Sequence, residues 1–299
     1  MTRWSKKMVD KLTSENVIKI NKMNYTYNII KEYKYQLILI YIYMSICQLL
    51  YLAGPYVLGK MIDGLLVKEY FWMGCFIVIA AFENIFTYKR MIYDTKIYTT
   101  IYNNIVLKYL KNNENTNPST KIARIELSSD IINFLENDIH FFIYAIITIV
   151  GTLFFIFIQN PLTAFIVLSA TIPIFIIVCF FYKKIKQCTI VSNNAYENKV
   201  EILTQNNFEL IESFYKRRKK IHTHRSTIQG KNLASLNITK TLFLILGIVV
   251  FTHSSINLSL GQSVSMYTYI NQFLISLMSI PMGVETFTRI KDIISRIKE

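Results

Sequence analysis

Six long apolar runs, separated by polar stretches, dominate the sequence. The first begins near Tyr35, and the other five cover residues 70–88, 141–158, 162–182, 238–256 and 264–284. Each run is about 18–22 residues long, close to the roughly 20 residues that an α-helix needs to cross a hydrocarbon core of about 30 Å. A hydrophobic fraction of 52% is typical of the same class of protein. The pattern therefore predicts an all-α integral membrane protein with six transmembrane helices.

Two of the polar stretches are much longer than the others. Residues 89–139 and 183–237 each span about 50 residues and are poor in Gly, Pro and Ser. In the first of them, Ile97, Ile101 and Ile105 recur at the spacing of one helix face. A structureless loop of this length is rare in a compact domain. Each stretch is therefore predicted to form two helical cytoplasmic extensions joined by a short crossing piece.

The crossing pieces and the N-terminal segment set the expected domain boundaries. Residues 112–119 and 205–207 interrupt the apolar spacing, which places the crossing pieces there. Residues 14–33 alternate apolar and basic positions, a pattern typical of an interfacial helix on the inner membrane surface. We expect a cytoplasmic N-terminal segment over residues 1–34 and one six-helix transmembrane domain over residues 35–299.

The 33 Lys and Arg residues are divided unevenly among the connections. The segment before Tyr35 holds 8 of them, the first connection holds only Lys60 and Lys68, and the connections 159–161 and 257–263 hold none. The other 23 lie in residues 89–124, in residues 183–240 and in the tail from Arg289 onward, so the division is 31 to 2. Basic residues concentrate on the cytoplasmic side of membrane proteins, which predicts a cell-membrane protein with both termini in the cytoplasm. Because they alternate with apolar runs, the net charge of +14 does not indicate nucleic-acid binding.

Polar side chains inside the apolar runs are candidates for a substrate pathway. Glu83 lies in the inner half of the second run, where a carboxylate is costly and by default indicates a pathway or proton-handling role. Pairing with a neighbouring group at the inner interface is the alternative for this residue. The sixth run carries a polar face formed by Thr268, Asn271, Gln272, Ser276 and Ser279. Such a face is expected either to line a wet cavity or to hydrogen-bond to neighbouring helices.

Several short motifs occur in the order and spacing of one family. They are Pro55, Gly59, Ile62 and Asp63 in the first run, 123–130 before the third, 201–215 before the fifth, and Gly261, Tyr269, Pro281 and Arg289 in the sixth. With the six runs and the two long helical stretches, they resemble the transmembrane domain of ABC exporters over most of residues 35–297.

That resemblance implies two kinds of partner, a second six-helix chain and separate ATPase subunits. Two copies, or one copy and a paralogue, would form a homodimer or heterodimer around a central cavity in the lipid bilayer. Separate ATPase subunits would dock at the crossing pieces and bind the ATP. This chain itself would hold no cofactor. For this coupling we select Phe208, Glu209, Phe214 and Tyr215.

Motifs for ATP or metal binding are incomplete. Residues 54–60 (GPYVLGK) have the two Gly and the Lys of a P-loop, but Met61 stands where a Ser or Thr is needed. Residues 258–262 (LSLGQ) resemble the ABC signature sequence but fall on the predicted external side. His222 and His224 are two residues apart, which suits no common zinc spacing. We therefore expect a permease that is not itself an enzyme and holds no metal.

Two other functions fit the same fold. One is a proton-driven peptide transporter without an ATPase, in which Glu83 would be the proton site. The first crossing piece lacks aromatic residues and glycine, as this alternative predicts. The other is a membrane partner protein that does not transport. The substrate and the direction of transport do not follow from the sequence.

Overall fold

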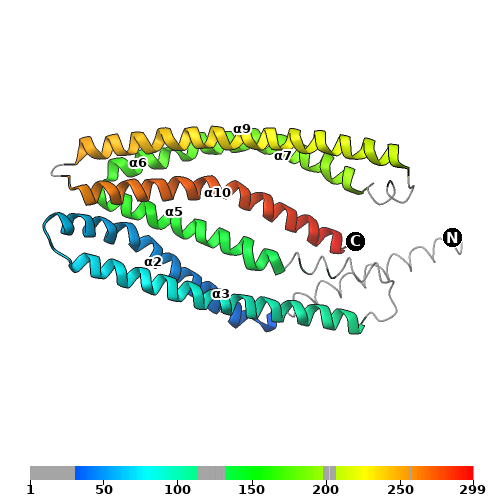
Figure 1. Ribbon diagram of the computed structural model, residues 1–299, viewed down its shortest axis with the longest axis horizontal. Coiled ribbons are helices and arrows are strands. Elements are labelled where there is room, and N and C mark those ends of the chain that lie inside the picture. Colours follow the sequence, from blue (N-terminus) through cyan, green and yellow to red (C-terminus); the bar gives the residue numbers. More distant parts are fainter. Residues whose placement is uncertain are drawn as a thin grey trace, which may run out of the picture. The chain divides into compact units, whose positions relative to one another are not determined.

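The computed structural model describes residues 31–112, 125, 129, 132–197, 202, 207–255 and 258–298, and its regular elements are helices (Figure 1). In chain order they are α2 (Lys34–Leu66), α3 (Phe71–Asn112), the π-helix η1 (Phe134–Asp138), α5 (Ile139–Gln159), α6 (Pro161–Ser169), α7 (Thr171–Glu197), α9 (Phe208–Ser254) and α10 (Leu260–Lys298). The all-α membrane fold is confirmed. The predicted interfacial helix at 14–33, apart from its last three residues, and the crossing piece at 112–119, apart from Asn112, lie outside the described residues.

Five segments of the described chain are long and apolar enough to cross a membrane: Lys34–Leu66, Phe71–Lys111, Phe134–Gln159, Pro161–Ile185 and Phe208–Ser254. They contain the first five predicted runs. The sixth run lies on α10, where Thr268, Asn271, Gln272 and Ser276 reduce the hydropathy of the described part. A sixth crossing therefore stays a prediction.

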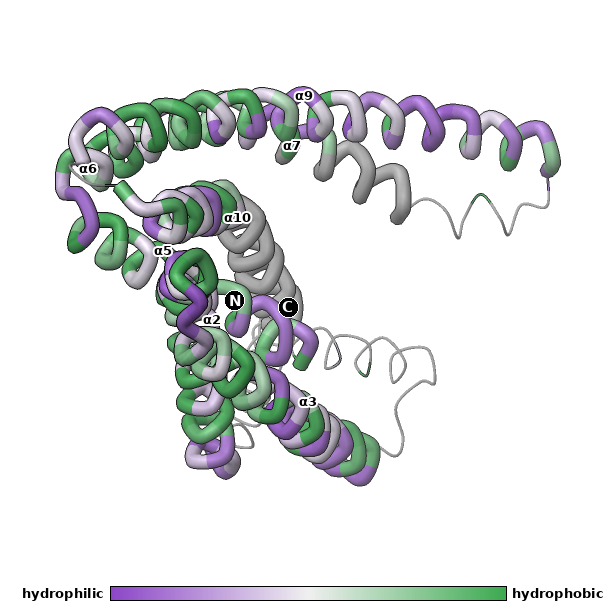
Figure 2. The backbone as a smooth tube through the Cα atoms, turned by 60° about the vertical axis from the view of Figure 1, so that its left-hand side comes forward, coloured by the Kyte–Doolittle hydropathy of each residue, from purple (hydrophilic) through white to green (hydrophobic). Residues whose placement is uncertain are grey.

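The helices α3 and α9 confirm one predicted helical extension in each long polar stretch, residues 89–112 of the first and 208–237 of the second. They contain 42 and 47 residues. At 1.5 Å per residue they measure about 63 and 70 Å, roughly twice the hydrocarbon thickness. Figure 2 shows α9 hydrophobic over its C-terminal half and hydrophilic toward Phe208. In α3 and in α9, one continuous helix thus contains both an apolar run and its polar extension.

The fourth predicted run is divided into two helices at Ala170, a break that the sequence reasoning did not predict. Pro173 has no N–H to donate to the carbonyl of Ser169, so the ladder is interrupted there. The hydroxyl of Ser169 donates to the Ile166 carbonyl, and that of Thr171 donates to the Leu168 carbonyl. Both bonds satisfy carbonyl groups of α6 before the turn.

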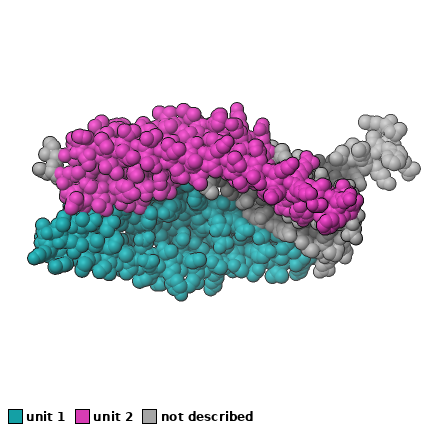
Figure 3. Space-filling view, turned by 45° about the horizontal axis from the view of Figure 1, so that its top comes forward, with its two compact units in different colours: residues 1–151, 279–299 teal, residues 152–278 magenta. Residues whose placement is uncertain are grey.

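The chain forms two compact units, which are described separately (Figure 3). Unit 1 consists of residues 1–151 and 279–299, and unit 2 of residues 152–278. Two helices therefore change unit along their length, α5 after Gly151 and α10 after Met278.

Unit 1 has a hydrophobic core at the predicted inner end of its helices. The side chains in this core are Leu37, Ile40, Tyr98, Ile101, Ile105 and Ile132. The start of α2 thus packs against the extension of α3, although both Leu37 and Ile40 belong to the first predicted run. Further along, the rings of Tyr43 and Phe86 lie 6.0 Å apart. The helix that contains the first run is therefore longer than the membrane requires, and its initial turns pack against the extension of α3.

Unit 2 is organised around the first half of α10. The side chains of Met266, Tyr269, Ile270, Phe273 and Leu274 are fully buried. The ring of Tyr269 stacks on that of Phe155 from α5, with centroids 4.9 Å apart and planes 3° apart. Gly247 of α9 permits a close approach, since a Cβ there would lie 3.0 Å from both Ile270 and Val167. Tight packing of small and large side chains holds this unit together.

Candidate functional site

The start of α10 explains the LSLGQ sequence. Ser259 precedes the helix, and its hydroxyl accepts a hydrogen bond of 3.1 Å from the backbone N–H of Gln262. The Gln262 side chain in turn accepts one of 3.3 Å from the backbone N–H of Ser259. This reciprocal arrangement is a capping box, which satisfies two N–H groups that a helix start leaves unpaired. The sequence that resembles an ATPase signature is therefore a helix-start signal here.

The predicted polar face of α10 is partly covered. Thr268, Asn271, Gln272 and Ser279 are half-buried, and Ser276 is buried. The Thr268 hydroxyl donates to the Val264 carbonyl of its own helix. Within the described part of the chain, Oε1 of Gln272 is buried without a hydrogen-bond partner.

These observations leave the substrate-pathway assignment of α10 a prediction. Of its five residues, Ser279 belongs to unit 1 and the others belong to unit 2.

Glu83, the remaining pathway candidate, lies on α3 in unit 1 and is half-buried. Its neighbour Asn84 donates from its side chain to the Ala80 carbonyl of the same helix. Among the residues that the structure describes, Glu83 has no ion-pair partner within 4.0 Å. The interfacial pairing that was the alternative interpretation is thus not seen in this part of the chain.

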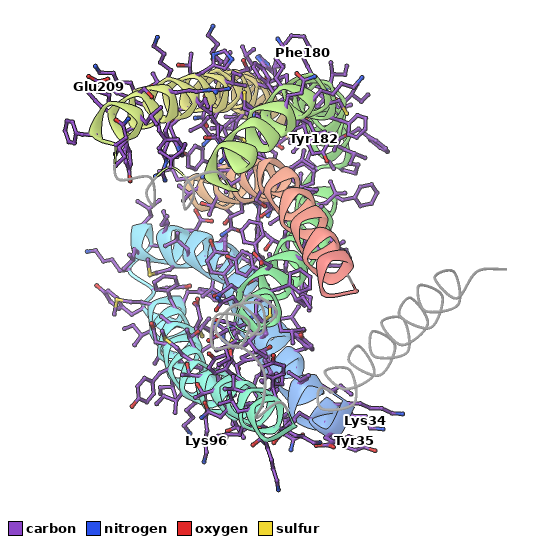
Figure 4. The ribbon with its side chains drawn as sticks, turned by 90° about the vertical axis from the view of Figure 1, so that its right-hand side faces the viewer. Lys34, Tyr35, Lys96, Phe180, Tyr182 and Glu209 are labelled. Atoms are coloured by element: carbon purple, nitrogen blue, oxygen red, sulfur yellow. The ribbon has the colours of Figure 1, made fainter. Side chains whose placement is uncertain are left out.

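The predicted coupling residues occupy the first two turns of α9. Asn207 caps this helix, because its side-chain oxygen accepts from the backbone N–H groups of Glu209 and Leu210 at 3.1 and 3.4 Å. This cap confirms a helix break at residue 207. Figure 4 labels Glu209 at this end of α9. Its charge is favourable beside the positive end of the helix dipole.

The four coupling candidates differ in exposure. Phe208 is 78% exposed and Tyr215 is 43% exposed, whereas Phe214 is only 8% exposed. Glu209 is exposed as well. The buried Phe214 contributes to packing, and its ring meets that of Tyr215 edge-on at 5.4 Å. Phe208 and Tyr215 are therefore the aromatic side chains available to a partner at this end of α9.

A polar cluster that the sequence reasoning did not select lies inside unit 1. Asp94, which is 6% exposed, has its Oδ2 atom 3.9 Å from Nε of Arg90 and 4.0 Å from Nε2 of His140. The rings of Tyr41 and Tyr98 each meet the His140 ring edge-on, at 5.8 and 5.9 Å. Arg90, Asp94 and Tyr98 share one face of α3 because they are four residues apart, which the sequence does reveal. Their meeting with His140 depends on packing between helices.

The cluster adjoins the π-helix η1. The Tyr98 hydroxyl donates to the Leu135 carbonyl at 3.1 Å, and Nδ1 of His140 is hydrogen-bonded to the Glu136 carbonyl. A π-helix widens the backbone ladder, so its carbonyls are accessible to side chains. Two side chains of the cluster are thus fixed to η1.

The other sequence candidates have plain structural surroundings. Residues 54–60 lie within α2, so the P-loop-like sequence is helical. His222 and His224 are exposed on α9, and Nε of Arg218 lies 3.5 Å from Nε2 of His222. Among the described residues, no group of three or more His, Cys, Asp or Glu side chains is placed to hold a metal ion.

Comparison with known proteins gives the family. Among curated proteins, none matches the chain. The family model described as the ABC transporter transmembrane region matches residues 27–270. That range covers the helices α2 to α9, η1 and the first part of α10, and the chain therefore belongs to this family.

Proposed function

We propose that this chain is the membrane permease subunit of an ABC-type transporter and that separate subunits hydrolyse the ATP. The family match carries the membrane-component part of this proposal. A homodimer, or a heterodimer with a related six-helix chain, would surround the substrate pathway. The candidate pathway residues are Thr268, Asn271, Gln272, Ser276, Ser279 and Glu83.

The geometry of α9 supports a separate ATPase subunit. Phe208 lies about 50 Å along the helix from Thr241, where the dense apolar part begins, at 1.5 Å per residue. Phe208 and Tyr215 expose aromatic rings there, next to the exposed carboxylate of Glu209. Large exposed aromatic side chains typically act as anchors at protein interfaces. An ATPase subunit bound at this end would contact the polar end of the longest described helix.

Purification in mild detergent tests the proposal. We expect an ATPase subunit to co-purify with the wild-type chain from its native host. The double variant Phe208→Ala and Tyr215→Ala should lose it, because each truncated anchor costs about 2 kcal/mol of binding energy. Leu233→Ala is the matched control, since Leu233 lies on α9 and is 57% exposed. Retention of the ATPase by the double variant would contradict the assigned docking residues.

Phe214→Ala separates docking from packing. Because Phe214 is 8% exposed, we expect its truncation to destabilise the permease by about 3 kcal/mol. A loss of ATPase binding in this variant is informative only where its unfolding temperature is unchanged. An unchanged temperature together with a lost partner would place Phe214 at the interface.

The proposed topology follows from the division of basic residues. Lys60 and Asn257 are expected to be external, and Lys108 and Lys216 cytoplasmic. Single cysteines at these positions, in a background without native cysteines, can be labelled with a membrane-impermeant thiol reagent. Labelling of intact cells at 108 or 216, but not at 60 or 257, would reverse the orientation.

Proton-driven transport is the second candidate function, favoured by one observation. Glu83 is half-buried in an apolar run and has no ion-pair partner in the described part of the chain. If protons drive transport, Glu83→Gln should abolish substrate accumulation and a protonophore should do the same. Under the preferred proposal, neither treatment stops transport in cells supplied with ATP.

A further inference from the structure

Asp94, which is buried, and the half-buried Arg90 and His140 form a polar cluster that neither the family match nor the proposed function explains. Arg90 and Asp94 come from α3, and His140 from the first turn of α5. Within the described part of the chain, Nε of Arg90, Oδ1 of Asp94 and Nε2 of His140 are buried without hydrogen-bond partners. Buried polar atoms are normally paired, and exceptions concentrate at functional sites.

The hydrogen bond at the other ring nitrogen fixes the tautomer of His140. Its Nδ1 faces the Glu136 carbonyl, which can only accept a hydrogen bond. Nδ1 must therefore carry a proton and donate it. In a neutral imidazole this leaves Nε2 as a bare lone pair, and Nε2 is the atom that faces Asp94 at 4.0 Å.

If Asp94 is ionised, its carboxylate faces the lone pair of His140 Nε2, so two hydrogen-bond acceptors lie opposite each other. A carboxylate offers only lone pairs, so the two atoms would repel each other unless a proton lies on one of them. One added proton gives either an imidazolium with a carboxylate, or an imidazole that accepts from a carboxylic acid. Both forms attract, and both contain the same number of protons.

The neighbouring charges favour that extra proton. On α3, Arg90 supplies one positive charge against Asp94. On η1, the Glu136 carboxylate acts on Asp94 as a like charge. Tyr41 from α2 and Tyr98 from α3 face the ring of His140. With both tyrosines neutral, one arginine and two carboxylates leave a deficit of one positive charge, which a proton on the pair removes.

We propose that Asp94 and His140 together bind one proton, which joins the middle of α3 to the start of α5. The predicted runs 70–88 and 141–158 place both residues just outside the membrane, on the side predicted to be cytoplasmic. The proton therefore exchanges with the cytoplasm. Its release leaves two acceptors facing each other and weakens the connection between the helices. This site is separate from Glu83 and from the polar face of α10.

Thermal unfolding of the reconstituted protein between pH 7.5 and 9 tests the proposal. The unfolded chain holds no extra proton at these pH values, since an unperturbed Asp is ionised and an unperturbed His is largely neutral. If the folded pair holds one, stability falls as pH rises, by about 3 °C in unfolding temperature for each pH unit until the proton is released. Asp94→Asn and His140→Gln should each abolish this dependence, because their amide N–H can donate to the remaining partner without a titrating proton.

Matched variants and a direct observation complete the test. Glu136→Gln removes one of the two carboxylates but neither partner, so the pH dependence should remain and move to lower pH, and Asp94→Glu should preserve it. In a chain with His222, His224 and His253 replaced by Gln, nitrogen NMR of His140 should show protonation to a pH about one unit higher than with Asp94→Asn. Stability that is flat or rises with pH in the wild type, or an identical His140 titration in both proteins, would overturn the proposal.

Discussion

The buried polar groups of the two units differ in kind. Unit 1 encloses Asp94, the one charged side chain among the buried residues that the structure describes, together with Gln48 and Thr148. Unit 2 buries hydroxyl and amide groups, for example Thr163 and Asn160. The hydroxyl of Thr163 donates to the side chain of Asn160, only three residues away, and the Asn160 amide donates to the Ser254 hydroxyl of α9, a neutral partner. Asp94 has its own helix neighbour Arg90 but also faces His140 from a different helix.

Because of that difference, the stability of each unit depends on a different kind of contact. A hydroxyl inside a helix is satisfied by nearby groups, so its pairing survives small shifts of the helix. A buried charge requires a partner at a fixed place, and in unit 1 that partner comes from across the packing between α3 and α5. The stability of unit 1 should thus respond to single polar substitutions, and that of unit 2 to changes of side-chain volume.

The largest expected effect is from Asp94→Ala in unit 1. Removing the carboxylate leaves Arg90 and His140 in a largely buried site without their anion, which we expect to cost about 3 kcal/mol. Thermal unfolding in detergent measures the change. Glu69→Ala is the control, since Glu69 is exposed in the connection between α2 and α3 and should change stability by less than about 0.5 kcal/mol. Equal effects of the two variants would show that the cluster does not stabilise unit 1.

The second prediction compares the effect on stability of adding a side chain at two glycines of α9 in unit 2. A Cβ at Gly247 would lie 3.0 Å from Ile270 and Val167, whereas one at Gly230 would have no neighbour within 4 Å. Gly247→Val should cost about 1–3 kcal/mol through overpacking. Gly230→Ala should stabilise the protein by about 0.5–1 kcal/mol, because alanine is the better helix former. Destabilisation by both, in chemical unfolding, would mean that backbone effects and not packing decide the outcome.

Local signals in the sequence predicted much of the fold. Apolar runs indicated the position of each long helix, and the interruption of the apolar spacing at residues 205–207 indicated where α9 begins. Pro173 is a local signal for the break at Ala170, although residues 162–182 were predicted as one helix. These features depend on neighbours within a few residues, and periodicity and capping rules describe such neighbours well.

Contacts between residues that are far apart in the sequence could not be predicted from local signals. Asp94 and His140 are 46 residues apart along the chain, and no periodicity connects them. The polar end of α9 gave no indication that Phe214 is buried while Phe208 and Tyr215 are exposed, since an amphipathic pattern is weak there. The candidate site was therefore selected by residue type and by the family resemblance, and its contacts came from the fold.

The smallest expected effect is from Ser259→Ala at the start of α10 in unit 2. The substitution removes the hydroxyl that accepts from the Gln262 N–H, and the reciprocal bond from Gln262 loses its support. The loss of an N-cap typically costs about 1 kcal/mol. Ser259→Asp retains an acceptor and places a negative charge at the positive end of the helix dipole, so it should keep most of that stability. Hydrogen exchange of the first turn of α10, compared with that of the first turn of α9 as an internal reference, measures the effect locally. If Ser259→Ala and Ser259→Asp exchange equally fast, α10 begins independently of its cap, and the packing of Tyr269 and Ile270 alone holds this end of unit 2.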